Sequence, residues 1–271
     1  MKLDTITDNH MHIDPINGDG IEAVKRFKRA GGTCLFLVNK MSKDLGVNIR
    51  GARDFEEVFD RTIALKEKII KETDLKVFAV IGVHPAEFVF LCDKLGIDRA
   101  LEITKEAVEL AGMKVSEGMA TAIGEMGRPH FSVDDKLLEA SNELLIHAME
   151  AAKDASCPIQ VHAESASRAL FEDLSSKAKS IRLKTEKVVK HFCGAHVALA
   201  EEYGIMPSVL ASKENIMASL KNPRFFMESD YIDDRRRPGA VLGPKTVPKT
   251  TLKLIEEGFL SVEDATRIHK D

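Results

Sequence analysis

The sequence of 271 residues contains no tryptophan, two tyrosines and four cysteines. The cysteines lie far apart and form no Cys-x-x-Cys pair, which argues against a structural zinc site and against a disulfide framework in a chain of this length. We therefore expect four free thiols, at Cys34, Cys92, Cys157 and Cys193.

The sequence also has no hydrophobic run long enough to cross a membrane. Its first residues, Met1 to Asp4, do not open the apolar core of a signal peptide. We expect a cytosolic protein without a membrane partner.

An excess of positive charge is missing as well. The 39 lysines and arginines are outnumbered by 43 aspartates and glutamates, which gives a formal net charge of −4. Proteins that coat nucleic acid depend on neutralising phosphate charge, so this balance excludes that class and leaves room for local contacts only. There is no linker-like stretch, shift in composition or fixed repeat, and we expect one domain over residues 1–271. The oligomeric state is left open.

Apolar, β-rich runs alternate with amphipathic segments along the chain. Eight runs with the features of buried strands, each followed by a helical segment, favour a (β/α)8 TIM barrel over an open doubly wound α/β sheet. Residues 230–248 are polar and rich in proline, which predicts a long loop, and Ser261 is expected to open a terminal helix. The predicted strands are 3–9, 33–38, 76–83, 120–126, 158–163, 187–192, 205–210 and 224–229. The predicted helices before the terminal one are 20–30, 54–72, 98–115, 134–155, 165–178, 195–203 and 213–220.

His10-Met11-His12 follows the first predicted strand. Side chains two apart on extended chain share a face, so both imidazoles can point at one cation, and neutral imidazole is the commonest metal ligand. Two solvated loop histidines would give the same motif by chance. The residues further along the chain decide between the two interpretations.

Further residues of metal-ligand type fall at the ends of later strands, where a barrel of this kind has its active site. Four imidazoles and two carboxylates suit two divalent cations, with a glutamate able to bridge them and an aspartate able to act as general base toward water. Hydrolysis is the reaction that needs these parts. The six ligands are His10, His12, Glu125, His162, His191 and Asp230, and His84 falls at a strand end beside them.

Taken together, these motifs resemble the TatD family of metal-dependent deoxyribonucleases in the amidohydrolase superfamily. The resemblance runs from the first strand to the loop after the eighth. It rests on His10-Met-His12, Gly82-Val-His84-Pro85, Gly124-Glu125-Met-Gly127, Val161-His162, His191-Phe-Cys-Gly194 and Glu228-Ser-Asp230.

The resemblance implies a role for each ligand and a nuclease activity. It implies that His10 and His12 hold a first metal, that His162 and His191 hold a second, and that Glu125 bridges the two. Asp230 would ligate the first metal and act as the base. Zinc is expected first, with manganese or magnesium as alternatives. The expected substrates are nucleic-acid ends or small phosphodiesters.

The sequence departs from the family pattern in places that concern the substrate. Arg128-Pro129-His130 stands where the family has Leu-Asp after the fourth-strand glutamate, and Glu164 stands where the family often has arginine. His84 and Arg128 are expected to contact the substrate, Arg128 by gripping a phosphate. The triplet Arg235 to Arg237 is either a second phosphate grip or a solvated cluster.

Several alternatives stay open at this point. The same chemistry would hydrolyse a small amide, ester or lactone, and a barrel that binds metal without turnover would carry the same ligands. His162-Ala-Glu164 matches half of a nucleobase-deaminase motif, but the cysteine half is missing. The remaining histidines are expected to have structural or solvent roles: His130, His147, His196 and His269.

Overall fold

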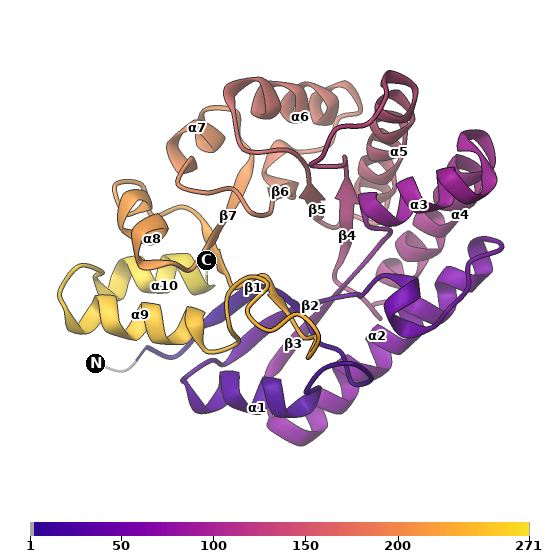
Figure 1. The fold of residues 1–271 in the computed structure, drawn as a ribbon. Helices are drawn as coiled ribbons and strands as arrows, with labels where there is room; N and C mark the ends of the chain where they lie inside the picture. The colour runs from indigo at the N-terminus through magenta and orange to yellow at the C-terminus, as the bar shows by residue number, and fades with distance from the viewer. Residues whose placement is uncertain (1–2, 271) are drawn as a thin grey trace.

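The computed structural model describes residues 3–270, in which parallel strands alternate with helices and curl into a (β/α)8 barrel (Figure 1). The sheet order is β8-β7-β6-β5-β4-β3-β2-β1-β9, every neighbouring pair is parallel, and β1 and β8 lie side by side where the sheet curls round. The strands are β1 (Thr7–His12), β2 (Cys34–Val38), β3 (Lys76–Ile81), β4 (Ala122–Gly127), β5 (Ile159–His162), β6 (Val188–Lys190), β7 (Met206–Leu210), β8 (Phe226–Glu228) and β9 (Tyr231–Ile232).

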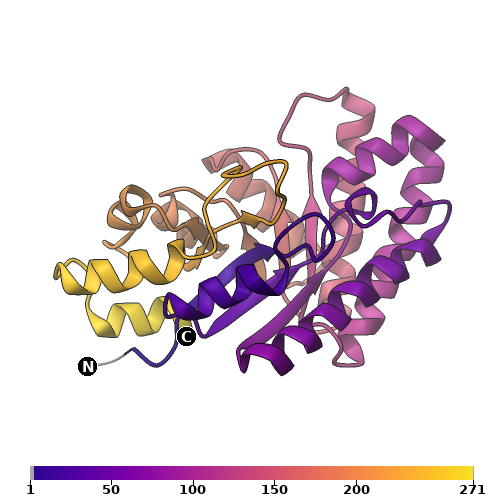
Figure 2. The ribbon, with the colours of Figure 1, turned by 60° about the horizontal axis from the view of Figure 1, so that its bottom comes forward.

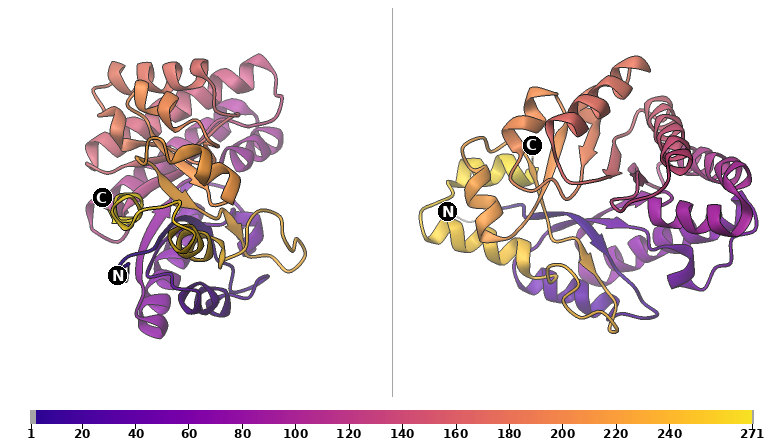
Figure 3. Two further views of the ribbon diagram at one scale, coloured as in Figure 1. Left: turned by 90° about the vertical axis from the view of Figure 1, so that its left-hand side faces the viewer. Right: turned by 45° about the horizontal axis from the view of Figure 1, so that its top comes forward.

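Helices cover the outside of the strands, as the turned views show (Figures 2 and 3). In the part of the chain that is described, no helix is long and apolar enough to span a membrane. The helices are α1 (Ile21–Arg29), α2 (Ala52–Thr73), α3 (Pro85–Leu95), α4 (Ile97–Ser116), α5 (Asp135–Asp154), α6 (Arg168–Ser180), α7 (Val197–Glu202), α8 (Lys213–Ser219), α9 (Thr246–Glu256) and α10 (Val262–Lys270), with short 3-10 turns at Ser42–Leu45 and Thr185–Lys187.

The alternation of side chains along β1 and β2 separates core from site. Leu35 and Leu37 of β2 and Met11 of β1 pack outward with Phe27 of α1. Val38, on the other face of β2, packs inside the barrel with Val80 and Ala122. Because successive side chains of a strand point to opposite faces, an outward Met11 sets the residues on either side of it toward the barrel interior.

The structure confirms the predicted barrel and corrects four local predictions. The first strand is Thr7–His12 instead of 3–9, so the paired histidines lie on the strand and not after it. Helix α3 is an additional helix, with Pro85 at its first position, where the missing proline N–H does no harm. The predicted loop 230–248 contains strand β9 and the start of helix α9, and neither was predicted. The terminal helix begins as expected, since Ser261 Oγ accepts the Asp264 N–H at 2.9 Å.

Helix α10 packs against the beginning of β1, at the end of the barrel opposite to the strand ends. His269 of α10 is buried there, and its Nδ1 accepts the Thr7 N–H at 3.1 Å. Its Nε2 lies 2.8 Å from Thr251 Oγ1 of α9. Both ring nitrogens are therefore paired, which agrees with the structural role expected for this histidine.

At the opposite end, strand β9 joins the loop after β8 to β1. Tyr231 pairs with Met11 and Ile232 pairs with His12. The buried Asp233 that follows accepts N–H groups of the loop after β1, from Asp14 at 3.1 Å and from Gly20 at 2.8 Å. The two loops are thus held to each other by strand pairing and by the Asp233 carboxylate.

Candidate metal centre

The ends of six different strands bring the predicted site residues together. His10 and His12 lie on β1, Glu125 on β4 and His162 at the end of β5, while His191 follows β6. Asp230 follows β8 and His84 follows β3. All seven residues lie within one cluster of contacts around the Glu125 carboxylate or next to it.

The two oxygens of Glu125 face two different sets of histidines. Oε2 lies 3.3 Å from His10 Nε2 and 3.4 Å from His12 Nε2. Oε1 lies 2.7 Å from His162 Nδ1 and 3.0 Å from His191 Nε2. One carboxylate therefore stands between two imidazole pairs, which is the arrangement a bridging ligand needs.

Asp230 belongs to the first of these sets. Its Oδ1 lies 3.9 Å from the Nε2 atoms of both His10 and His12. Its backbone is left-handed, with φ of 46°, which is uncommon for a residue other than glycine and is found at functional sites. Burial raises the pKa of its carboxyl above the ordinary value, although nearby histidines act against this.

The side chains fit a divalent cation by their chemistry. The Nε2 atoms of His10 and His12 are 3.1 Å apart, and His191 Nε2 is 3.3 Å from His162 Nδ1. Ring nitrogens of two neutral imidazoles that converge in this way offer lone pairs to one point. The structure contains three groups of side chains whose ligand atoms lie within 4.8 Å of one another and could hold a metal: His10, Glu125 and His191; His10, His12 and Asp230; and His84, Glu125 and His162.

Charge balance within the cluster points the same way. Burial opposes ionisation of Glu125, but His191 and the other histidines hold its pKa well below the ordinary value. Burial also disfavours the charged form of His191, yet Glu125 and Glu228 raise its pKa to about 10. In the absence of a metal, the protonated His191 ring supplies the positive charge between the two buried carboxylates, and a cation bound by these residues would take over that charge as the ring loses its proton.

Glu228 supports His191 from the side away from Glu125. Its Oε1 lies 3.3 Å from His191 Nδ1 and accepts the Phe192 N–H at 2.7 Å, and its Oε2 accepts from Ser208 Oγ at 2.5 Å. Burial would raise the pKa of Glu228, but His191 and these hydrogen bonds lower it to about 2. A carboxylate behind a ligating histidine orients the ring and makes it a better ligand.

His84 is held in one tautomer. It caps α3 by accepting the Ala86 N–H on Nδ1 at 3.0 Å, so the neutral ring carries its proton on Nε2, 3.7 Å from Glu125 Oε1. Burial lowers the pKa of His84 to about 3, which keeps the ring neutral. It can therefore donate a hydrogen bond to a ligand in the cluster.

Arg128 lies at the site but is engaged elsewhere. Its guanidinium donates to Glu164 Oε1 at 2.7 Å, to Asn142 Oδ1 at 2.9 Å and to Asp173 Oδ2 at 2.6 Å. It follows Gly127, where a Cβ would lie 1.8 Å from the His162 carbonyl oxygen. The predicted phosphate grip by Arg128 would require these ion pairs to open, and it stays a prediction.

His130, which was expected to have a structural or solvent role, stands at the edge of the cluster. Its Nδ1 lies 2.8 Å from His162 Nε2, the ring nitrogen that points away from Glu125. The sequence feature that indicates this contact is the position of His130, five residues after Glu125. Of the arginine triplet, Arg235 pairs with Asp19 and Arg236 with Asp234, which agrees with a solvated cluster.

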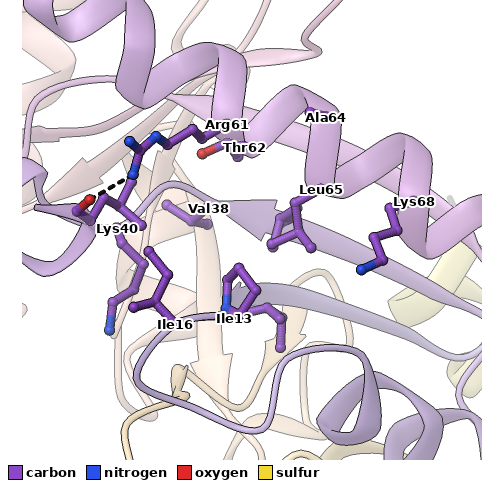
Figure 4. Close-up of a pocket in the computed structure, with 12 residues that line it drawn as sticks. Ile13, Ile16, Val38, Lys40, Arg61, Thr62, Ala64, Leu65 and Lys68 are labelled. Atoms are coloured by element: carbon purple, nitrogen blue, oxygen red, sulfur yellow. Dashed lines mark hydrogen bonds between the residues drawn. The ribbon is translucent and has the colours of Figure 1, made fainter. Parts of the chain in front are cut away.

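A separate apolar cavity of about 280 Å³ lies between α2 and the ends of β1 and β2 (Figure 4). Ile13, Ile16 and Leu65 contribute apolar walls, with Lys68 at one side. None of the clustered histidines or carboxylates lines this cavity. It is therefore distinct from the metal centre.

Comparison with known proteins gives a family and a fold. The sequence model of the family described as TatD related DNase matches residues 7–271. A relative from Methanocaldococcus jannaschii, the uncharacterized protein MJ1127, is 44% identical over 273 residues, which cover 100% of this chain and 95% of the relative.

Two solved structures from Escherichia coli share the fold. The phosphotriesterase homology protein, complexed with phosphate in its active site, aligns over 100% of this chain and 97% of its own with a TM-score of 0.67 and 14% identity. The TatD homologue YjjV aligns over 98% of each chain with a TM-score of 0.65 and 17% identity. These likenesses agree with a (β/α)8 barrel over the whole chain.

Proposed function

The chain belongs to the TatD-related DNase family, and from this premise we propose that it is a divalent-metal-dependent phosphodiesterase that cleaves nucleic-acid ends or small phosphodiesters. The observation that carries the proposal is the position of Glu125, whose two oxygens face one histidine pair each.

We assign the ligands by these distances. A first cation would be held by His10, His12 and Asp230, and a second by His162 and His191, with Glu125 shared by both. Zinc suits this set of imidazole and carboxylate donors best, and manganese is the alternative we rank next. When bound, the cations would polarise the phosphoryl group and lower the pKa of water.

The side chains of the site have the remaining roles in the proposed reaction. Asp230, beside His10 and His12, accepts the proton of the attacking water at its carboxylate. His84 donates its Nε2–H to a phosphoryl oxygen beside Glu125. Glu228 fixes His191, and Asn39 fixes His12 through a contact of 3.2 Å between its carbonyl oxygen and His12 Nδ1.

The proposal is tested by loading the purified protein with zinc, manganese or magnesium and assaying each form against four substrates. These are duplex DNA, single-stranded DNA, a chromogenic phosphodiester, and a panel of esters, lactones and amides. We expect turnover of the phosphodiesters, with single-stranded ends and the small diester favoured over intact duplex. Efficient hydrolysis of a carbonyl substrate without phosphodiester activity under any metal would replace the proposal by a small-molecule hydrolase.

A further inference from the structure

Five aromatic rings form a continuous row across the metal centre. Successive ring centroids from Phe131 through His130, His162 and His191 to Phe192 are separated by 5.3, 5.0, 5.3 and 5.9 Å. The three inner rings are histidines of the cluster or its edge. The two outer rings are phenylalanines, so the row ends in an apolar ring on each side.

Both phenylalanines are exposed, and Phe192 is exposed next to a buried histidine. Phe131 is 43% and Phe192 is 47% exposed, while His191 beside Phe192 is buried. Exposed phenylalanines scattered over a surface need no explanation. Two that occupy both ends of a ring row through the ligand cluster are not scattered, and they place exposed apolar rings beside His130 and His191.

Phe192 is also held in place by its backbone. Its φ is 53°, in the left-handed region that a bulky residue rarely adopts. The Phe192 N–H donates to Glu228 Oε1 at 2.7 Å, the same carboxylate that stands behind His191. The conformation is therefore determined by the groups that orient a ligand, and it presents the ring instead of burying it.

The surrounding charge favours bases over phosphates as the source of affinity. Arg128 is paired with Glu164 and Asp173, and the protein as a whole is acidic. A grip on the phosphate backbone is thus weak, and binding energy has to come from elsewhere. Aromatic rings stack with any base, but only with bases that are not already stacked in a duplex.

We propose that Phe131 and Phe192 are stacking platforms for the bases on either side of the cleaved phosphodiester. The inference rests on the proposed function and adds the two residues that contact the bases. The nucleobase is the committed occupant.

The experiment compares the metal-loaded wild type with Phe131→Leu, Phe192→Leu and the aromatic replacement Phe192→Tyr. Each enzyme is assayed on a single-stranded oligonucleotide, on the same oligonucleotide with abasic residues flanking the cleaved bond, and on a dialkyl phosphodiester. Phe259→Leu is the matched control, because Phe259 is 51% exposed in the turn between α9 and α10, away from β4, β5 and β6 (Figure 1).

We expect each leucine variant to raise KM for the normal oligonucleotide by roughly 5- to 150-fold, the range of one lost stacking contact. Phe192→Tyr should retain the wild-type KM, and Phe259→Leu should leave every parameter unchanged. Because the abasic oligonucleotide lacks both bases, the wild type should lose about the product of the two single-variant factors on it, and on that substrate the leucine variants should match the wild type.

Contrary results separate the inference from the proposed function. Equal wild-type cleavage of the normal and abasic oligonucleotides would overturn the stacking inference and leave the phosphodiesterase standing. A similar loss on the dialkyl diester would show that the rings support the metal centre instead of the bases. Absence of cleavage of any phosphodiester would overturn the proposed function and the inference with it.

Discussion

The two ends of β1 both bury histidines, but they pair them differently. At the beginning of the strand, His269 has Thr7 N–H on one ring nitrogen and Thr251 Oγ1 at the other. At the end of the strand, His10 is fully buried, its Nε2 converges with that of His12, and its Nδ1 has no hydrogen-bond partner among the described residues.

The difference gives a criterion for a functional histidine. Burial does not distinguish the two ends, because both His269 and His10 are inaccessible to solvent. The partners of the ring nitrogens do. Both nitrogens of His269 are paired by groups of the fold, whereas His10 Nε2 faces His12 Nε2 at 3.1 Å and the carboxylates of Glu125 and Asp230 at 3.3 and 3.9 Å. The saturated end supports the fold, and the other end is where a bound cation would complete the set of contacts.

The strongest test of this contrast is Asp230→Asn. The variant should lower the hydrolytic rate by about 10²- to 10⁴-fold, because the amide cannot accept the proton of the attacking water. Metal content should fall far less, since the other five ligands remain. Turnover numbers and elemental analysis of the same preparation check both points. Near-full turnover would reduce Asp230 to a ligand at most.

A smaller effect is expected from His130, which holds His162 from outside the cluster. His130→Leu removes the acceptor 2.8 Å from His162 Nε2 and should weaken binding of one cation by about 10- to 100-fold, as loss of an outer hydrogen bond to a ligating histidine does. His130→Asn, which keeps an acceptor near the position of Nδ1, should recover most of the affinity. Competition with a chelator measures it. Equal losses in the two variants would contradict the assignment.

The saturated end should respond in stability instead of activity. His269→Leu leaves the buried Thr7 N–H unpaired and should lower the free energy of unfolding by about 1–3 kcal/mol. In excess chelator, His10→Leu should cost less or add stability, because it removes a buried group with an unpartnered nitrogen. Urea unfolding of both variants gives the comparison. A larger loss for His10→Leu would invalidate the criterion.

The pH dependence of stability should have opposite signs for two buried groups, His269 of α10 and Glu87 of α3. Burial lowers the pKa of His269 to about 4, so the unfolded chain binds the extra proton and the stabilising contribution of the neutral ring is lost as pH falls from 6.5 to 4. Burial raises the pKa of Glu87, in the first turn of α3, to about 7, so its contribution is lost as pH rises from 4.5 to 7.

Each of these groups contributes a slope of at most ~1.4 kcal/mol per pH unit. Relative to wild type, Glu87→Gln should gain stability as pH rises through its window, and His269→Leu should gain it as pH falls through its own. Urea midpoints at half-unit intervals between pH 4 and 7.5, in chelator, measure the two differences. Slopes of the same sign would show that burial does not control the pKa values of Glu87 and His269.

The sequence predicts the ligand cluster better than its surroundings. His10, Glu125, His162 and Asp230 could be placed together because apolar runs mark the strands, and parallel strands of a barrel deliver their ends to one rim. The position of a ligand along the chain is then enough to place it in space. The distances that divide the histidines between the two oxygens of Glu125 were not available from the pattern.

Contacts between distant segments account for what was missed. Arg128 and Glu164 both depart from the family pattern. Taken separately, Arg128 predicts a contact to a phosphate and Glu164 predicts the loss of one. In the structure their side chains form a single ion pair across 36 positions. The β9 strand has two residues, and its pairing with β1 has no local signal. His130 showed no sequence sign of its contact with His162 beyond its place after the fourth strand.

The β9 ladder also bears on how this barrel can diversify. Asp230 is followed at once by two residues paired to β1 and by Asp233, which receives amides from the loop after β1. The exposed stretch 235–240 lies beyond this anchor. Insertions, deletions or grafted segments there would reshape the rim without displacing Asp230. The loop at the rim of the barrel can therefore be exchanged, by evolution or in a library of swapped loops, while Asp230 keeps its position.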